Sequence, residues 1–140
     1  MPVFRPASAT QINAGLLIAR VVIGLTFVAH GAQKFFVMGI PALVGGFGQM
    51  GIAMPAITAP AVVFVEIFAG LALAIGLLTR VASLGLVVVM LGAGFIAHGS
   101  GGFFLPTGYE FTLVLGSVAT MFAITGAGAW SVDARIARRS

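Results

Sequence analysis

Long apolar runs, each near the length that crosses a bilayer, decide what this chain can fold into. A membrane-spanning helix needs about 20 predominantly apolar residues. Four such runs lie at residues 12–36, 57–78, 81–98 and 110–126, and only 7% of the 140 residues are charged. A soluble domain carries about 25% charged residues. The sequence therefore predicts an all-α integral membrane protein, a four-helix bundle that forms a single membrane domain over residues 1–140.

The start of the chain is predicted to remain as the first span. Arg5 precedes an apolar run, as in a signal peptide, but Arg20 interrupts that run and no small-residue cleavage pattern follows. Asn13 is the expected N-cap of this helix. Strands are not expected, because the runs are too long and lack the alternation of a barrel strand.

Basic residues at the ends of the runs predict the orientation. Five of them fall on one side of a four-span bundle, namely Arg5, Arg80, Arg135, Arg138 and Arg139. By the positive-inside rule, both termini should be cytoplasmic, with residues 131–140 forming a basic tail at the inner membrane face. We expect a multi-pass protein of the bacterial cytoplasmic (inner) membrane. The basic residues are scattered without a patch, so a nucleic-acid partner is not indicated.

Cysteine is absent from the chain. This excludes a disulfide, a thiolate nucleophile, a persulfide carrier and cysteine-ligated iron–sulfur or zinc sites.

Two linking segments should cover the end of the bundle away from the termini. Residues 37–55 carry no charge and are rich in Gly, Met and Pro. A solvated loop of this length would rarely be so apolar, so we expect it either to lie in the membrane interface or to fold back over the bundle, with a short helix at 42–50. Residues 99–109 form a glycine-rich loop from which Phe103 and Phe104 are expected to dip into the membrane.

Ionisable residues inside the apolar runs are the candidates for function, because each is costly in a membrane. Arg20, His30 and Lys34 share one face of the first run, and Glu66 is the only acid in the second. A count of about 1.5 Å per residue places Arg20 about 10 Å and Glu66 about 18 Å from the cytoplasmic ends. Lys34 comes out about 13 Å beyond Glu66. The sequence therefore predicts a structural ion pair between Arg20 and Glu66.

A second polar layer is predicted nearer the outer face. His30 and His98 both lie about 25 Å from the cytoplasmic ends, with Glu110 close to that level. Candidate catalytic residues are His30, His98, Glu110 and Lys34, and candidate ligand-binding residues are Gln33 and Tyr109.

Several chemistries fit this outer layer. It could bind the carbonyl groups of a quinone, with Glu110 passing protons and Lys34 stabilising negative charge. A b-type haem between the histidines is disfavoured, because the pattern shows no further haem signal. A metal on two histidines and a carboxylate is equally weakly supported, and no metal site is predicted. Polar closure of the bundle without chemistry stays open, and the cofactor stays unknown.

The chain resembles the DoxX family of small four-helix bacterial membrane proteins over about residues 14–130. The resemblance rests on three blocks: LLIARVVIGLTFVAHGAQKFF in the first run, Glu66 with GLALAIGLLTR in the second, and His98 with GGFFLPTGYEF before the fourth. It implies a bundle in the cytoplasmic membrane and a link to sulfur, thiol or oxidative-stress redox chemistry. In one branch, a related subunit belongs to a membrane thiosulfate:quinone oxidoreductase.

The leading hypothesis is a membrane redox subunit that binds a quinone-like molecule and acts with partner enzymes. Whether the chain is itself an enzyme, as a quinone-linked oxidoreductase subunit, stays open. One alternative is a non-catalytic scaffold that docks cytoplasmic redox enzymes through Arg80 and the basic tail. Another is a carrier of a small molecule or lipid, with residues 37–55 as a lid. The bilayer is the certain partner, and a homo-oligomer is also considered.

Overall fold

The first helix begins earlier than the sequence predicts. The computed structural model describes residues 5–139, and in it α1 spans Ala9–Ala32. Ser8 is the N-cap: its hydroxyl accepts a hydrogen bond from Gln11 N–H, and the Gln11 side chain accepts one from Ser8 N–H. The expected cap, Asn13, instead lies inside α1 and its Oδ1 accepts a hydrogen bond from Ala129 N–H.

The other secondary-structure elements of residues 5–139 are also helices. A π-helical segment, Gln33–Met38, extends α1. The others are α2 (Ile40–Gln49), α3 (Pro55–Phe64), a π-helical segment (Val65–Ala69), α4 (Gly70–Ile75), α5 (Thr79–Gly92), a π-helical segment (Ala93–Ala97), a 3₁₀ turn (Gly99–Gly101), α6 (Glu110–Thr125) and α7 (Val132–Ala137). Residues 1–4 and 140, which include the last residue of the predicted tail, lie outside the described part.

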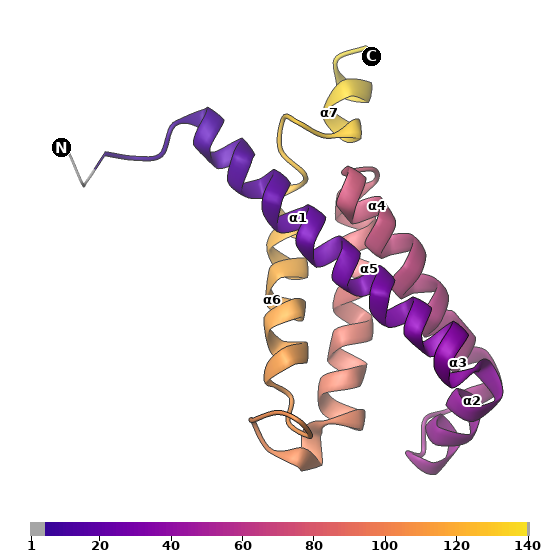
Figure 1. The fold of residues 1–140 in the computed structure, drawn as a ribbon. Helices are drawn as coiled ribbons and strands as arrows, with labels where there is room; N and C mark the ends of the chain where they lie inside the picture. The colour runs from indigo at the N-terminus through magenta and orange to yellow at the C-terminus, as the bar shows by residue number, and fades with distance from the viewer. Residues whose placement is uncertain (1–4, 140) are drawn as a thin grey trace.

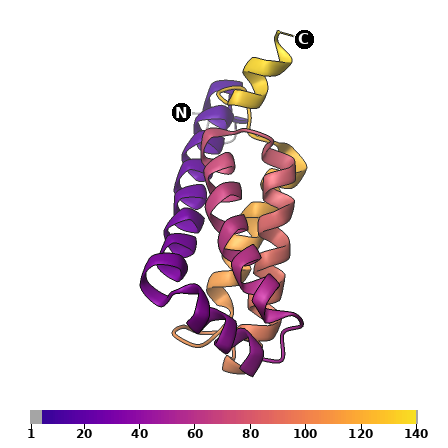
Figure 2. The same cartoon turned by 90° about the vertical axis from the view of Figure 1, so that its right-hand side faces the viewer.

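The helices form an upright bundle with two different ends (Figures 1 and 2). The start of α1 and the short helix α7 lie at one end, called here the terminal end. The helix α2 and the loop between α5 and α6 lie at the other, called here the loop end. The predicted short helix is confirmed as α2, and of the two expected positions the structure shows the folded-back one, since α2 packs on α3 and buries Leu43 against Ala59 and Val63.

Three helices are long and apolar enough to cross a membrane: Ala9–Met38, Pro55–Ile75 and Thr79–Ala97. The shortest of them has 19 residues, or about 28 Å of helix. The fourth predicted span, α6, is apolar but has 16 residues, which falls below the usual length. The all-helical prediction is thus confirmed for residues 5–139, and the fourth crossing stays a prediction.

The close crossing of α1 and α4 sets the register of the bundle. A Cβ placed on Gly24 would lie 2.5 Å from the Gly70 carbonyl oxygen, and one on Gly70 would lie 2.8 Å from the Gly24 oxygen. The two backbones therefore touch, as small residues allow in membrane helices. Phe27 packs beside this crossing and joins the core of Leu73, Leu86 and Phe122.

Arg20 joins three segments at the terminal end. Its guanidinium is buried and donates hydrogen bonds to the carbonyl oxygens of Ala74 (3.3 Å), Ala127 (2.7 Å) and Trp130. These carbonyls belong to the last turn of α4 and to the link between α6 and α7. A buried charge needs such hydrogen bonds, so Arg20 fixes the link between α6 and α7 to the bundle.

Asp133 holds α7 at the same end by capping α5. Its carboxylate accepts hydrogen bonds from the N–H groups of Leu78 (2.7 Å) and Thr79 (2.9 Å), which have no partner inside α5. Burial acts to raise the pKa of Asp133, but the hydrogen bonds from Thr79 and Leu78 and the charge of Arg20 outweigh it and hold this pKa below its ordinary value. The predicted basic tail is therefore attached to the bundle at its start.

We predict that Gly24→Ala destabilises the protein by about 1–3 kcal/mol, because the new methyl group must push α1 away from α4. Gly15→Ala is the matched control in the same helix, where a Cβ meets no atom within 4 Å. Unfolding in mixed detergent measures both. Equal stability of the two variants would contradict the backbone contact.

We predict that Asp133→Asn lowers the free energy of unfolding by about 1 kcal/mol near neutral pH, because the cap of α5 is weakened. The folded pKa of Asp133 is lowered, so its stabilisation is present above the ordinary carboxyl pKa and is lost as the pH falls through the folded value. The stability difference between wild type and variant should therefore shrink at acid pH. A difference independent of pH would be the contrary result.

Candidate functional site

Four of the candidate site residues line one cavity of about 460 Å³ near the loop end. They are His30 and Lys34 from the first long helix, Glu66 from the second, and His98 at the end of the third. The rest of the lining is mainly apolar and includes Phe27, Val62, Phe111 and Leu115. We call this space the polar cavity.

Lys34 and Glu66 form an ion pair in the polar cavity, and the predicted pair between Arg20 and Glu66 is wrong. Lys34 Nζ donates to both carboxylate oxygens of Glu66. The Glu66 side chain is 2% exposed and that of Lys34 is 25% exposed, so the lysine is the partner that reaches toward open space. Arg20 binds only backbone carbonyls.

The error comes from the register of the first two long helices. The sequence-based depths assumed that residues 12 and 78 lie level, which puts Arg20 near Glu66. In the structure α1 begins well outside the bundle (Figure 1), and Arg20 lies level with Ala74. Gly31 lies opposite Glu66, 3.1 Å from its Cβ when a methyl group is built on the glycine. Lys34, one turn further along, therefore reaches the carboxylate.

The two histidines differ in what holds them. The His98 Nδ1 lies 3.0 Å from the Ala93 carbonyl oxygen, so in the neutral ring Nδ1 carries the proton and Nε2 has a free lone pair. The His30 ring packs on Phe111 with 5.2 Å between centroids. Within residues 5–139 no hydrogen bond to a His30 ring nitrogen is formed, so both histidines offer a nitrogen to a ligand.

Three π-helical segments surround the polar cavity, one in each long helix. Lys34 lies in Gln33–Met38, Glu66 in Val65–Ala69, and His98 directly follows Ala93–Ala97. A π-turn inserts an extra residue into the helix and occurs frequently at functional sites. No sequence pattern used here predicts these turns, and all three polar positions depend on them.

Glu110, Gln33 and Tyr109 do not line the polar cavity. Glu110 Oε1 accepts a hydrogen bond from Leu105 N–H (2.8 Å) and so orders the loop after α5. Gln33 is exposed, and Tyr109 lines a different hollow between α5 and α6. The predicted outer cluster is thus divided: its two histidines and Lys34 meet, and the other members lie elsewhere.

The linking segment 37–55 supplies part of the wall of the polar cavity, and none of its residues was predicted to belong to the site. Phe47, Met50 and Ile52 line it from α2 and the turn after it, and Thr58 lines it from α3. The sequence carried a signal for this, since an uncharged Gly-, Met- and Pro-rich segment was expected to lie in the membrane interface or to fold back over the bundle. The structure adds that it covers the polar residues.

The chemistry of the polar cavity is that of hydrogen bonding to an uncharged group. The lysine and the glutamate neutralise each other, and each histidine has an available nitrogen. In the part of the chain that the structure describes, no group of three His, Cys, Asp or Glu residues is placed to hold a metal ion. A neutral molecule with carbonyl or hydroxyl groups on an apolar body fits these walls.

Comparisons with known proteins point to one family. The family model described as DoxX matches residues 15–99. A protein of Haemophilus influenzae, called uncharacterized, is 34% identical over 122 residues, which cover 84% of this chain and 87% of that protein. An uncharacterized membrane protein of Mycobacterium tuberculosis is 32% identical over 136 residues, with 86% and 80% covered.

A third relative carries a name that refers to an activity. The Bacillus subtilis protein called "Putative oxidoreductase CatD" is 27% identical over 123 residues, which cover 88% of this chain and 87% of that protein. No solved structure matches.

We predict a coupling energy of about 1–3 kcal/mol between Lys34 and Glu66 in a double-mutant cycle of Lys34→Met and Glu66→Met. Either single change leaves one charge unpaired, whereas the double variant leaves none and should recover much of the loss. The matched cycle of Arg20→Met with Glu66→Met should be additive, because these residues do not touch. Coupling in the second cycle and not in the first would restore the rejected pair.

Proposed function

The chain belongs to the DoxX family, and we propose that it is a redox subunit of the bacterial inner membrane that binds a quinone-like molecule in the polar cavity. One observation carries the proposal: two histidines with available ring nitrogens face a mainly apolar cavity that also contains a neutralised Lys34–Glu66 pair. The name of the Bacillus relative, which refers to an oxidoreductase, supports the same class of chemistry.

His98 suits the exchange of a proton with a bound ring. With Nδ1 held on the Ala93 carbonyl, the neutral imidazole accepts a hydrogen bond at Nε2, and the protonated ring donates one there. It therefore binds the hydroxyl of a quinol when neutral and the carbonyl of a quinone when protonated. His30, whose nitrogens have no partner within residues 5–139, binds the second oxygen.

Lys34 and Glu66 supply the electrostatic part of the proposed site. The Lys34 ammonium is the less buried partner of the pair and stabilises the negative charge that develops on the ring oxygen as the ring is reduced. Glu66 holds Lys34 in place and compensates its positive charge while the quinone ring is oxidised. Glu66 is therefore the carboxylate that lies near the two histidines, where Glu110 was expected from the sequence. We propose that the role of Glu110 is to position the loop after α5.

A partner enzyme must supply the electrons and protons that reduce the quinone. Reduction of one quinone to a quinol takes up two electrons and two protons. Oxidation of two thiols to a disulfide releases the same numbers, so a thiol- or sulfur-oxidising partner enzyme can supply both. The chain has no cysteine, so its own part is to hold the quinone and move the protons.

A scaffold role is the second candidate, and the terminal end favours it. Arg80, Arg135, Arg138 and Arg139 are exposed there, and none of them forms a salt bridge within residues 5–139. With the positive-inside orientation, and with α6 as the fourth span, these arginines face the cytoplasm and could dock a partner enzyme. This role does not explain the polar cavity, so we place it second.

We predict that His30→Ala and His98→Ala each weaken binding of a short-tailed quinone about 2- to 10-fold, the value of one hydrogen bond. The double variant should lose more than either single one. Equilibrium dialysis of purified protein in detergent measures the dissociation constants, with Thr125→Ala, at the far end of α6, as the control. Wild-type protein that binds no quinone would refute the proposed function.

A further inference from the structure

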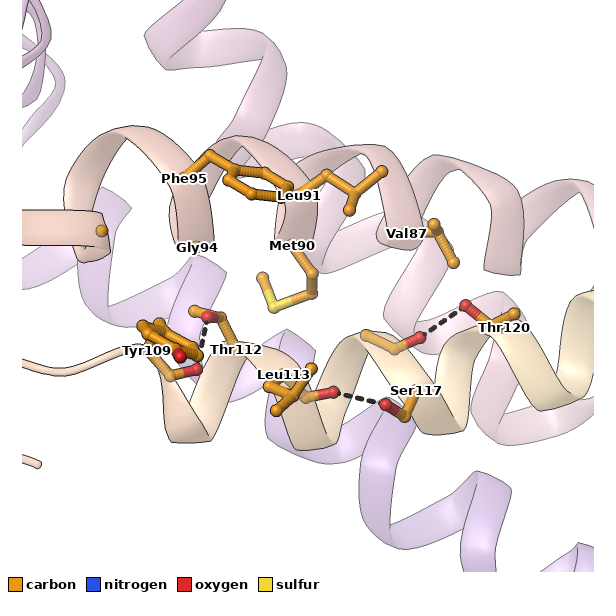
Figure 3. A pocket seen from close by; sticks show the side chains of 12 residues that line it. Val87, Met90, Leu91, Gly94, Phe95, Tyr109, Thr112, Leu113, Ser117 and Thr120 are labelled. Atoms are coloured by element: carbon orange, nitrogen blue, oxygen red, sulfur yellow. Dashed lines mark hydrogen bonds between the residues drawn. The ribbon is translucent and has the colours of Figure 1, made fainter. Parts of the chain in front are cut away.

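A second hollow lies between α5 and α6 on the outside of the bundle. Figure 3 shows it between the side chains of Val87, Met90, Leu91 and Phe95 on one helix and Tyr109, Leu113, Ser117 and Thr120 on the other. Its volume is about 500 Å³ and its walls are mainly apolar. We call it the α5–α6 groove.

The serine and threonine hydroxyl groups in the α5–α6 groove are already bound to backbone carbonyls. Ser117 donates to the Leu113 carbonyl (2.7 Å) and Thr120 to the Gly116 carbonyl (2.8 Å), as the dashed lines in Figure 3 mark. The Thr112 hydroxyl donates to the Tyr109 carbonyl (2.8 Å). These three hydroxyl groups therefore have their donors satisfied, Tyr109 adds one further hydroxyl at the end near His98, and the rest of the groove suits a hydrocarbon.

The polar cavity and the α5–α6 groove share a wall. Met90 and Thr112 line both. At the end of the third long helix the chain alternates between the two spaces, since His98 lines the polar cavity and Gly99 lines the groove. Only side chains of the seam between α5 and α6 therefore separate them.

This wall is thin and contains a flexible side chain. A methyl group built on Gly94 would lie 3.1 Å from Thr112 Oγ1, and one on Gly116 would lie 3.3 Å from Met90 Cβ. Each partner of the wall thus faces a glycine across the seam. Methionine has three rotatable bonds and adapts its shape readily, so Met90 can turn aside without a change of backbone.

The groove runs away from the polar cavity toward the middle of the bundle. From Tyr109 to Thr120 it follows 11 residues of the chain, or about 16 Å of helix. Its end at Gly99 and Tyr109 lies next to His98, and its other end, at Thr120, lies about two-thirds of the way along α6. A molecule with a polar ring and one long tail would fill both spaces in a single orientation.

From this geometry we propose that the ligand is a long-tailed membrane quinone, whose ring lies in the polar cavity and whose hydrocarbon tail passes beside Met90 and Thr112 into the α5–α6 groove. The proposal rests on the proposed function and adds the class of substrate to it. An uncharged ring is favoured over a phosphate headgroup, because Lys34 is already neutralised by Glu66. The shared wall of Met90 and Thr112 between the two spaces favours one molecule over two.

The expected effect of the tail is moderate. In a membrane, a tail leaves lipid to enter the groove, so it gains packing contacts and little hydrophobic free energy. We therefore expect a quinone with a long isoprenoid tail to bind about tenfold more tightly than the same ring with a short tail.

The test compares the two quinones by equilibrium dialysis on the wild type and two variants that fill the groove. Gly116→Leu places a side chain beside Met90, and Ser117→Leu adds bulk at an exposed position. Both should abolish the tenfold preference and leave the short-tailed quinone bound as in the wild type. Gly15→Leu, at an open position of α1, is the control and should keep the preference.

Each contrary outcome has a distinct meaning. If the wild type binds neither quinone, the proposed function itself fails. If it binds both equally, or keeps its preference for the long tail in both variants, the tail lies elsewhere and this inference is overturned while the proposed function stands. A change of oligomeric state in both variants, seen by size-exclusion chromatography with light scattering, would make the groove a contact between copies and would also overturn it.

Discussion

The contact between the backbones of α1 and α4 at Gly24 and Gly70 is the constraint on which the rest of the bundle depends. Side chains at this crossing would separate the helices, and glycine on both sides lets them meet directly. The register that follows puts Lys34 beside Glu66 and Arg20 beside the last turn of α4, at Ala74. One packing contact thus decides which charges are neighbours.

The sequence shows which charged side chains in the membrane need a partner, but it does not show which partner each one has. The sequence shows that Arg20, Lys34 and Glu66 must each be satisfied, because isolated charges are costly there. Choosing between the partners of Glu66 requires the relative height of two helices to within a turn. That height depends on where α1 begins and on the Gly24–Gly70 contact, and neither can be read from apolar run lengths. The backbone carbonyls that bind Arg20 could not be predicted, since the link between α6 and α7 has no pattern of its own.

The polar cavity was predicted in part for a similar reason. The matched depth of His30 and His98 needed only a coarse count, and both residues do line the cavity. The π-turns at Gln33–Met38, Val65–Ala69 and Ala93–Ala97 shift the face that each following residue presents, and regular helical periodicity does not contain them. The uncharged segment 37–55 was expected to lie in the membrane interface or to fold back over the bundle, and its apolar character accounts for the cover that α2 provides.

The acidic residues of the chain explain why chemistry is assigned to the polar cavity. There are three, and two lie near helix ends, where backbone N–H groups without partners are available. Asp133 binds Leu78 and Thr79, and Glu110 binds Leu105, so both serve the fold. Glu66 lies inside a helix, where backbone donors are already used, and must find a side chain. Its partner, Lys34, reaches it from the cavity wall, and the requirement to satisfy one buried acid therefore places a cation where a ligand can meet it.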